Sequence, residues 1–556
     1  MLALVSRSTW AARRDTAREA ALYVAMAARL ARDVPPFLQR RLSLDAARSH
    51  IARGLAEREV RFLDLVDRAV YQHPRSPYRQ LLAHAGCEHG DLRALVRTEG
   101  IEGALRRLAS QGVYVTFDEF KGRQVAVRGS ARFAFSDRDF DSPLIRVPHY
   151  FDFTGGTSGR PMPVARTLDV LEDVAAMLAV VFEAHGIDRP RHVLWRGGSP
   201  SYPLVHSRLG SRVELWLNPV RGLPVLARSG LMYLRGLARV AGHRIPMPRY
   251  GDLMNPEWVA RWLLHHPRHD GTVVVTCTIT SAVRVAAAAI ATGVPLTGVT
   301  FYVGGEPLTA RRRGAIEASG AGLLLDYSTN ELPSASSGCV NGVAPDDVHL
   351  MTNLYAVIQR QRELFTGGVS VDALLFTTLS PTAGKIGINV EPGDSARIEI
   401  RDGDCCRIGG LGLTTHLSDI RSFEKMSSEG TTFVRSNLIQ ILEEELPARF
   451  GGDPVDYQLV EEEGSDGATR LVLHIDPRVG RIDHGAVRAL LLSELRRGGL
   501  FSAFQAALIE RADSIIVRRR APLATRGGKV LPFHLQRNDE KSGVGAMPDQ
   551  GDRNWS

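Results

Sequence analysis

The segment from Thr154 to Pro161 contains residue types that suit the binding of an anion. Its first seven residues are small, hydroxylated or basic, and a proline ends it. With so little side-chain bulk, backbone N–H groups can turn inward around a phosphate. Arg160 adds a fixed positive charge. The segment predicts a phosphate-binding loop. A plain turn is the alternative for the loop alone, because it matches neither a Walker loop nor a Rossmann fingerprint.

Four further motifs follow this loop along the chain. They are Val303-Gly304-Gly305-Glu306-Pro307, the stretch Asp326 to Leu332, Pro392-Gly393-Asp394 and the stretch Thr525 to Pro532. The first two come at the ends of apolar runs that predict buried strands. Taken singly, Pro-Gly-Asp is typical of a turn and Gly-Gly-Lys of an exposed loop. Their order carries more information than any one of them.

This order of motifs resembles the adenylate-forming superfamily of acyl-CoA synthetases, adenylation domains and luciferases. Within it, the chain is most similar to the phenylacetate–CoA ligase and coenzyme F390 synthetase branch. The resemblance covers roughly residues 70 to 535. It implies an α/β fold: a large, multi-sheet N-terminal domain with a helical N-terminal extension, and a small, mobile α/β C-terminal domain.

The resemblance also implies an ATP site. The residues that would hold the β- and γ-phosphates are Thr154, Gly155, Gly156, Thr157, Ser158, Gly159 and Arg160. Gly304, Gly305 and Glu306 would line the adenine pocket, where a backbone without side chains lets a flat base approach. Asp326 and Tyr327 would support the base, with the tyrosine ring stacking on it. Asp394 would hold the ribose hydroxyls.

Three residues would complete the chemistry. Glu331 resembles the carboxylate that binds Mg²⁺, a cation that prefers oxygen ligands. Lys529 resembles the catalytic lysine of the small domain, which stabilises charge at the α-phosphate. Arg421 would be a shifted substitute for the arginine that contacts the ribose. The motif departs from the family at Ser328, where glycine is usual, and at Asn330, which would contact the α-phosphate in place of the usual threonine or serine.

Relatives in this branch can also carry a zinc-binding cluster of cysteine and histidine. The corresponding residues here are Cys339, His349, Cys405 and Cys406. Four such ligands suit tetrahedral zinc. Cys405 and Cys406 are adjacent in sequence, which is an unfavourable spacing for two ligands of one metal, so four reduced and partly buried residues are the alternative.

The implied activity is ATP-dependent activation of a carboxylic acid to an acyl-adenylate, followed by transfer to a thiol. Mg²⁺ and ATP are then required and coenzyme A is the expected co-substrate, with an aryl or arylacetic acid as the family default. A separate carrier protein or an amine is the alternative acceptor. A catalytically silent nucleotide-binding homologue is a further alternative. For the acyl pocket, Trp195, Tyr202, His206 and Trp216 are candidates, with ordinary core positions as the other interpretation.

Composition narrows the class of protein. The chain has 556 residues, a net charge of +8 and 44% hydrophobic residues, as in ordinary globular proteins. The positive charge is spread along the chain and no groove-reading motif is present, so we expect no nucleic-acid partner. Five cysteines do not make a disulfide framework and favour a cytoplasmic location. No apolar run approaches the ~18 residues that span a bilayer. The apolar stretch from Ala20 to Ala28 predicts a helix packed on the body, with a membrane-surface helix as the alternative.

Periodicity and the resemblance together imply the domain organisation. Residues 1–110 read as a helical region and 538–556 as a disordered tail, and the resemblance implies a large adenylate-forming domain at 111–423 and a small domain at 424–537. From residue 143 onward, short apolar runs alternate with helical patterns, which predicts a mostly parallel sheet. The expected strands are 192–195, 213–217, 272–276, 298–303 and 323–325. The expected helices are 168–182, 256–265, 281–291 and 310–318. In the small domain, helices are expected at 437–446 and 483–497 and strands at 456–462, 470–475 and 514–518.

Overall fold

The computed structural model divides the chain into two compact units. It describes residues 2–153, 162–197, 199–218, 223–252, 255–265, 272–305, 308–363, 370–422, 427–428, 431–432, 441–463, 469–497, 515–524, 530 and 532–535. The larger unit extends through Arg362 and resumes from Ser370 to Arg421. The smaller unit comprises Glu363 and the described residues from Ser422 to Ala524 and from Val530 onward. Each unit is described separately below.

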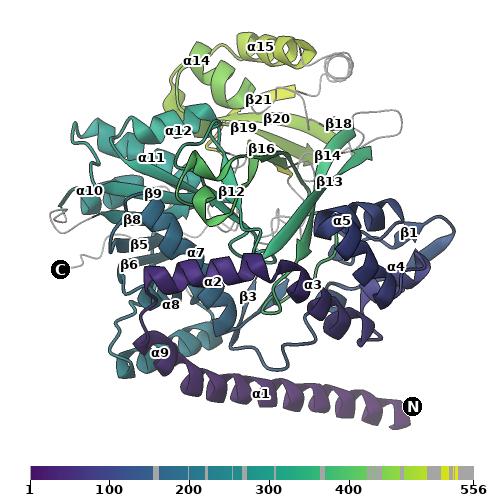
Figure 1. The fold of residues 1–556 in the computed structure, drawn as a ribbon. Helices are drawn as coiled ribbons and strands as arrows, with labels where there is room; N and C mark the ends of the chain where they lie inside the picture. Colours follow the sequence, from purple (N-terminus) through teal and green to yellow (C-terminus); the bar gives the residue numbers. More distant parts are fainter. Residues whose placement is uncertain are drawn as a thin grey trace. The chain divides into compact units, whose positions relative to one another are not determined.

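The first 110 residues of the larger unit are helical, as the sequence predicts (Figure 1). The helices are α1 (Leu2–Gln39), α2 (Leu44–Ala56), α3 (Arg58–Val66), a π-helical turn (Asp67–Tyr71), α4 (Pro77–His84) and α5 (His89–Ser110). Ser43 caps α2 by accepting a hydrogen bond from the backbone N–H of Ala46 at 3.2 Å. Apolar residues of α3, α4 and α5 pack in one buried cluster, so these helices belong to the core of the unit.

A twelve-stranded sheet forms the centre of the larger unit, in the order β13-β14-β15-β16-β12-β11-β10-β9-β8-β5-β6-β7. The parallel half consists of β5 (Arg191–Trp195), β6 (Arg212–Asn218), β7 (Arg249–Tyr250), β8 (Val273–Thr278), β9 (Val299–Gly304) and β10 (Gly322–Tyr327). The other half consists of β11 (Ser336–Gly338), β12 (Val348–Leu350), β13 (Tyr355–Glu363), β14 (Ser370–Thr378), β15 (Asp394–Ile400) and β16 (Thr415–Ser422). Antiparallel pairing begins where β11 joins β10. The predicted α/β architecture is confirmed, but the sheet is mixed rather than mostly parallel.

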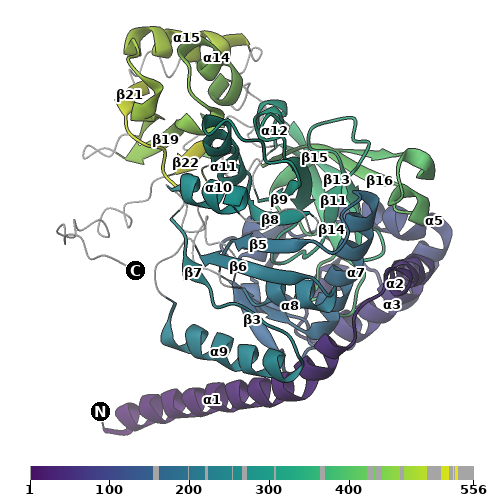
Figure 2. The same cartoon turned by 90° about the vertical axis from the view of Figure 1, so that its left-hand side faces the viewer.

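Helices connect the parallel strands and cover both faces (Figure 2). These are α7 (Leu168–Ala184), α8 (Ser201–Arg208), α9 (Val225–Val240), α10 (Pro256–His265), α11 (Ile279–Ala291) and α12 (Ala310–Glu317). The chain winds outward from β5 to β6 and β7, and then from β8 to β9 and β10 in the other direction. The strand order therefore reverses between β5 and β8, and in such sheets ligands bind at the carboxyl ends of the strands near this reversal.

The smaller unit is built on a four-stranded sheet in the order β21-β20-β19-β22. Its strands are β19 (Tyr457–Glu463), β20 (Thr469–Ile475), β21 (Ile515–Arg519) and β22 (Phe533–Leu535). Helix α15 (His484–Arg497) matches its prediction, whereas the helix expected at 437–446 is described only from Ile441, as a π-helical turn followed by α14 (Leu446–Phe450). Residues 538–556 lie outside the described part of the chain.

No helix among the described residues is long and apolar enough to cross a bilayer.

Two buried histidines stack on one another between β5 and α8. The rings of His192 and His206 have centroids 3.5 Å apart and an interplanar angle of 22°. Both side chains are fully buried, and neither ring nitrogen of His192 has a hydrogen-bond partner. Burial holds the pKa of His192 well below its usual value and lowers the pKa of His206 to about 3. Both imidazoles are therefore neutral in the folded protein at pH 7.

This pair predicts a loss of stability in acid. In the unfolded chain histidine titrates near pH 6.5. The stabilising contribution of the two neutral rings is thus complete above this pH and falls as the pH drops toward 3. We expect a loss of about 1.4 kcal/mol for each histidine per pH unit in this window. His192→Phe should flatten the dependence of the unfolding free energy on pH in urea titrations, and His243→Phe, at a half-buried position, is the control. An equal slope for both variants would contradict this account.

Candidate active site at the carboxyl ends of the parallel strands

The glycine-rich loop connects the two strands of a hairpin. Strand β3 (Tyr150–Phe153) pairs antiparallel with β4 (Pro163–Arg166), and Phe153 lies opposite Pro163. The loop residues Thr154 to Arg160 lie outside the described residues, as do two other predicted site residues, Glu306 and Lys529. The hairpin nevertheless determines where the loop begins and ends.

Asn330 joins this hairpin to the segment that follows β10. Its side-chain amide donates to the carbonyl of Phe153 at 2.5 Å. Arg166 of β4 donates in turn to the carbonyl of Asn330 at 2.7 Å. The residue that begins the hairpin's connection and the residue that ends β4 thus both contact Asn330, which lies 177 positions beyond Phe153 in the chain. The structure brings the hairpin that flanks the loop and the segment after β10 together.

Asp152 anchors the hairpin from within. Its carboxylate is buried and accepts hydrogen bonds from Arg166 at 3.0 Å, from Ser199 at 2.7 Å and from Ser201 at 2.9 Å. The two serines follow β5 at the point where the strand order reverses. A buried carboxylate needs several donors to offset its desolvation, and these three supply them.

Gly304 and Asp326 end neighbouring parallel strands and lie side by side in register. A Cβ on Gly304 would lie 2.3 Å from the carbonyl oxygen of Asp326, so only glycine fits. Burial raises the pKa of Asp326, while hydrogen bonding by Ser328 and the charge of Arg196 oppose this shift. Gly305 has a φ of 81°, a conformation that favours glycine. Ser328, where the resemblance leads one to expect glycine, therefore has a hydrogen-bond partner, the carboxylate of Asp326.

Arg196 is a residue of this site that the sequence analysis missed. It follows β5 and donates to the carbonyl of Cys277 at 3.1 Å, to that of Gly304 at 3.3 Å and to the hydroxyl of Tyr202 at 3.0 Å. It therefore connects the carboxyl ends of three parallel strands. Its position directly after an apolar strand was the available signal. Of the acyl-pocket candidates, Trp195, His206 and Trp216 are core residues with 1% exposure each.

Tyr327 and Asp394 are in direct contact. The tyrosine hydroxyl donates to Oδ2 of Asp394 at 3.0 Å, across 67 residues of sequence. Burial and the neighbouring carboxylate hold the pKa of Tyr327 well above its usual value, so it remains protonated as a donor. The last residue of the Pro-Gly-Asp motif, at the start of β15, therefore lies beside Tyr327 at the end of β10.

Arg421 lies on β16, next to the strand that Asp394 begins. Its carbonyl accepts a long hydrogen bond of 3.5 Å from the hydroxyl of Ser395. Its guanidinium forms an ion pair with Asp346 at 3.0 Å. The arginine is thus near Asp394 along the sheet, but its charge is directed to Asp346.

Glu331 forms an ion pair with Lys121, a second residue that the sequence analysis missed. Lys121 directly follows α6 (Phe117–Phe120), whose start is capped by Thr116. Both side chains of the pair are largely buried, at 13% and 16% exposure. Burial by itself would raise the pKa of Glu331, but the charge of Lys121 and its hydrogen bond lower it. Glu331 is therefore ionised and could bind a cation. Only the Thr-x-x-Glu capping pattern before Lys121 hinted at this helix.

Comparison with known proteins gives structural similarity only. No family model matches the sequence, and no curated protein does. Among solved structures, ATP-bound MatB from Rhodopseudomonas palustris has 14% identity over 71% of this chain and 68% of its own, with a TM-score of 0.37. MenE from Bacillus subtilis, an O-succinylbenzoate coenzyme A synthetase in complex with ATP and magnesium, has 13% identity over 69% and 68%, with a TM-score of 0.38. The amide bond synthetase McbA from Marinactinospora thermotolerans has 12% identity over 90% and 99%, with a TM-score of 0.36. Similarity at this level does not assign the chain to a family.

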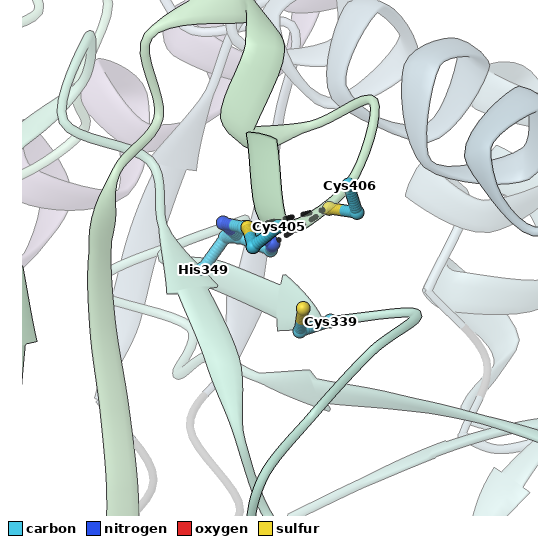
Figure 3. A group of neighbouring side chains, drawn as sticks. All are labelled: Cys339, His349, Cys405 and Cys406. Atoms are coloured by element: carbon cyan, nitrogen blue, oxygen red, sulfur yellow. Dashed lines mark hydrogen bonds between the residues drawn. The ribbon is translucent and has the colours of Figure 1, made fainter. Parts of the chain in front are cut away.

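The predicted cysteine and histidine cluster also comes together (Figure 3). The ligand atoms of Cys339, His349, Cys405 and Cys406 all lie within 4.8 Å of one another. Cys339 follows β11, His349 lies on β12, and the adjacent cysteines end a 3-10 turn. All four belong to the antiparallel half of the large sheet and the turn beside it.

The geometry of this cluster fits a tetrahedral metal. The sulfurs of Cys405 and Cys406 are 3.9 Å apart, close to the ~3.7 Å between two thiolates on one zinc. Cys405 lies in the 3-10 turn, whereas the backbone of Cys406 is fully extended. With this change of backbone conformation between them, the two sulfurs belong to the same cluster. Nδ1 of His349 donates to the carbonyl of Leu413 at 2.7 Å, which leaves Nε2 to act as a ligand. The expected obstacle of adjacent cysteines is therefore absent.

Proposed function

We propose that the larger unit binds Mg²⁺-ATP and uses it to activate a carboxylic acid as an acyl-adenylate. The observation that carries this proposal is the link through Asn330 between the hairpin of the glycine-rich loop and the segment after β10. The contact between Tyr327 and Asp394 adds a third motif to the same region. A triphosphate, its metal and a nucleoside need groups from several segments in one place, and these motifs offer an anion loop, carboxylates and an aromatic ring.

In this proposal each motif has one role. The loop from Thr154 to Arg160 binds the β- and γ-phosphates, and Gly304, Gly305 and Glu306 line the adenine pocket. Tyr327 and Asp326 support the base, and Asp394, which accepts a hydrogen bond from Tyr327, binds the ribose. Asn330 contacts the α-phosphate and Arg421 the ribose. Both would first have to leave their present partners, Phe153 and Asp346.

The reaction takes place in two steps. A carboxylate oxygen attacks the α-phosphorus, an oxygen–phosphorus bond forms, and the bond to the β-phosphate breaks, which releases pyrophosphate. A thiol then attacks the acyl carbon, so that a thioester forms and AMP leaves. Mg²⁺, when bound by Glu331, neutralises charge on the phosphates. Lys529 stabilises the negative charge that develops at the α-phosphate during the first step.

For the second step we propose coenzyme A as the acceptor and an aryl or arylacetic acid as the substrate. A carrier-protein thiol or an amine is the alternative acceptor. Incubation with ATP, an acid and each acceptor in turn distinguishes them, because the product mass identifies a thioester or an amide.

One observation favours a second candidate, a nucleotide-binding protein without turnover. The charges of Glu331 and Arg421 are already paired, with Lys121 and Asp346. A site that kept these pairs would bind ATP without releasing pyrophosphate. A pyrophosphate-release assay across a library of carboxylic acids decides between the candidates. Release that depends on one acid supports the enzyme, and tight ATP binding without release from any acid supports the silent homologue.

Replacing Lys529 by alanine should slow ATP–pyrophosphate exchange about a hundredfold, because one donor to the developing charge is lost. ATP binding and the melting temperature should remain near those of the parent protein. Lys541→Ala, at the lysine nearest to Lys529 in the sequence, is the matched control. Unchanged exchange would mean that Lys529 does not take part in the adenylation step.

We further propose that Cys339, His349, Cys405 and Cys406 bind one Zn²⁺. The donor set of three sulfurs and one nitrogen, the 3.9 Å separation of two of the sulfurs and the fixed tautomer of His349 support this. With all four positions supplied by protein, the role would be structural.

A further inference from the structure

Helix α9 carries an apolar face that points away from the core of the larger unit. Its buried row consists of Leu231, Leu234 and Ala238, which pack inward. The exposed apolar residues lie on the opposite side of the helix. They are Val225, Leu226, Met232 and Val240, with 83%, 62%, 58% and 77% of their surfaces exposed, and the half-exposed Tyr233. Single exposed apolar residues are ordinary, but five on one side of one helix form a stripe.

A row of arginines runs along one edge of this stripe. Arg228, Arg235 and Arg239 are separated by seven and four residues, which places them on one line of the helix. Arg228 and Arg239 are exposed and Arg235 is partly exposed. The helix contains no aspartate or glutamate. The stripe is therefore bordered by positive charge that no carboxylate of its own helix neutralises.

Helix α1 extends the same surface. The two helices lie side by side (Figures 1 and 2), and the hydroxyl of Tyr233 on α9 donates to the carbonyl of Ala27 on α1 at 3.0 Å. Tyr23, one turn before Ala27, is 40% exposed, and Val24 is also exposed. These residues belong to the apolar stretch from Ala20 to Ala28. The exposed apolar area thus spans two helices, and the arginine row lies on α9.

We propose that α9, together with the adjoining part of α1, is a docking surface for an anionic lipid bilayer. The helix would lie in the plane of the interface, with the apolar stripe among the acyl chains and the arginine row at the lipid phosphates. Charge complementarity favours this occupant over a second copy of the chain. A contact between two copies through α9 would bring two arginine rows together, with no carboxylate on either helix to pair with them. The surface is independent of the proposed nucleotide site.

Co-sedimentation of the protein with lipid vesicles tests this proposal. We expect binding to phosphatidylcholine vesicles that contain about one-third phosphatidylserine, and much weaker binding to pure phosphatidylcholine. The triple variant Arg228→Glu, Arg235→Glu, Arg239→Glu should weaken binding by more than about a hundredfold, because loss of each arginine's attraction alone costs about fivefold and the glutamates add repulsion. Leu226→Asp with Val240→Asp should weaken binding to a similar degree. These substitutions lie on an exposed face, so melting temperatures should not change.

The matched control is the triple variant Arg93→Glu, Arg97→Glu, Arg106→Glu, which changes three exposed arginines on α5 by the same total charge. It should bind vesicles almost as well as the parent protein. Failure of the parent protein to bind anionic vesicles, or equal loss in both triple variants, overturns the proposal. A dimer in sedimentation velocity that dissociates on Leu226→Asp would also overturn it, because the face would then be a contact between copies. Vesicle binding does not depend on ATP turnover, so the result is separate from that of the proposed function.

Discussion

Glu331→Gln should reduce acid-dependent pyrophosphate release on the order of a thousandfold. The glutamine is nearly isosteric but carries no charge, so it cannot neutralise a divalent cation at the phosphates. The concentration of Mg²⁺ needed for half-maximal rate should rise together with the loss of rate. Pyrophosphate release measured against Mg²⁺ concentration gives both quantities. Glu317→Gln, at an exposed carboxylate of α12, is the control and should leave them unchanged.

Lys121→Met distinguishes the contribution of the Lys121–Glu331 ion pair to stability from the role of Glu331 in binding Mg²⁺. Without Mg²⁺ the variant leaves Glu331 buried and unpaired, which should lower stability by about 3 kcal/mol. Mg²⁺-ATP should restore most of that loss, because the metal takes the place of the ammonium as counter-charge. A Glu331→Gln protein that kept both its rate and its Mg²⁺ dependence would contradict the proposed role of this carboxylate, and the Lys121–Glu331 pair would then be structural.

Removal of zinc should unfold part of the larger unit. If the four ligands hold a structural metal, its binding free energy contributes to folding, on the order of 10 kcal/mol in small zinc domains at neutral pH. Purified protein should contain about one zinc per chain by elemental analysis. Cys406→Ser and His349→Ala should abolish this content, lower the melting temperature steeply, and leave the protein insensitive to chelators.

The matched control for the zinc prediction is Cys87→Ser. Cys87 is another buried, free thiol of the larger unit, far from the cluster in the sequence. Its substitution should cost only the packing of one sulfur and should leave the zinc content unchanged. Metal-free protein with the same melting temperature in the presence and absence of chelator would remove the zinc proposal and leave four reduced side chains.

Much of the parallel half of the sheet follows from local sequence. The apolar runs beginning at His192, Val213 and Thr272 each become a strand with bounds within two residues of those expected. The helix at 256–265 matches to the residue. A strand buried on both faces must be apolar along its length, and the helix that follows must carry a 3.6-residue period, so both signals are present in a single window.

The strands of the antiparallel half of the sheet could not be predicted from local sequence in the same way. Strand β11 is Ser336–Gly338 and has no apolar run, and the three-residue strand β12 pairs with β16 at His349 and His416. These segments are extended because neighbouring strands supply hydrogen bonds, not because of their own propensity. The contact between Tyr327 and Asp394 depends on the same long-range pairing.

The order of the motifs, the alternation of helix and strand, and the identities of the groups able to bind phosphate or metal were readable from the sequence by itself. Only the tertiary structure decided which of these groups meet. In the folded chain, Glu331 forms an ion pair with Lys121 and the side chain of Asn330 binds the carbonyl of Phe153. The sulfurs of Cys405 and Cys406 lie close together in one cluster. The physical reason is that a local window records the conformational preferences of a segment, whereas charge pairing and burial depend on partners that are remote in sequence and become neighbours only when the sheet assembles.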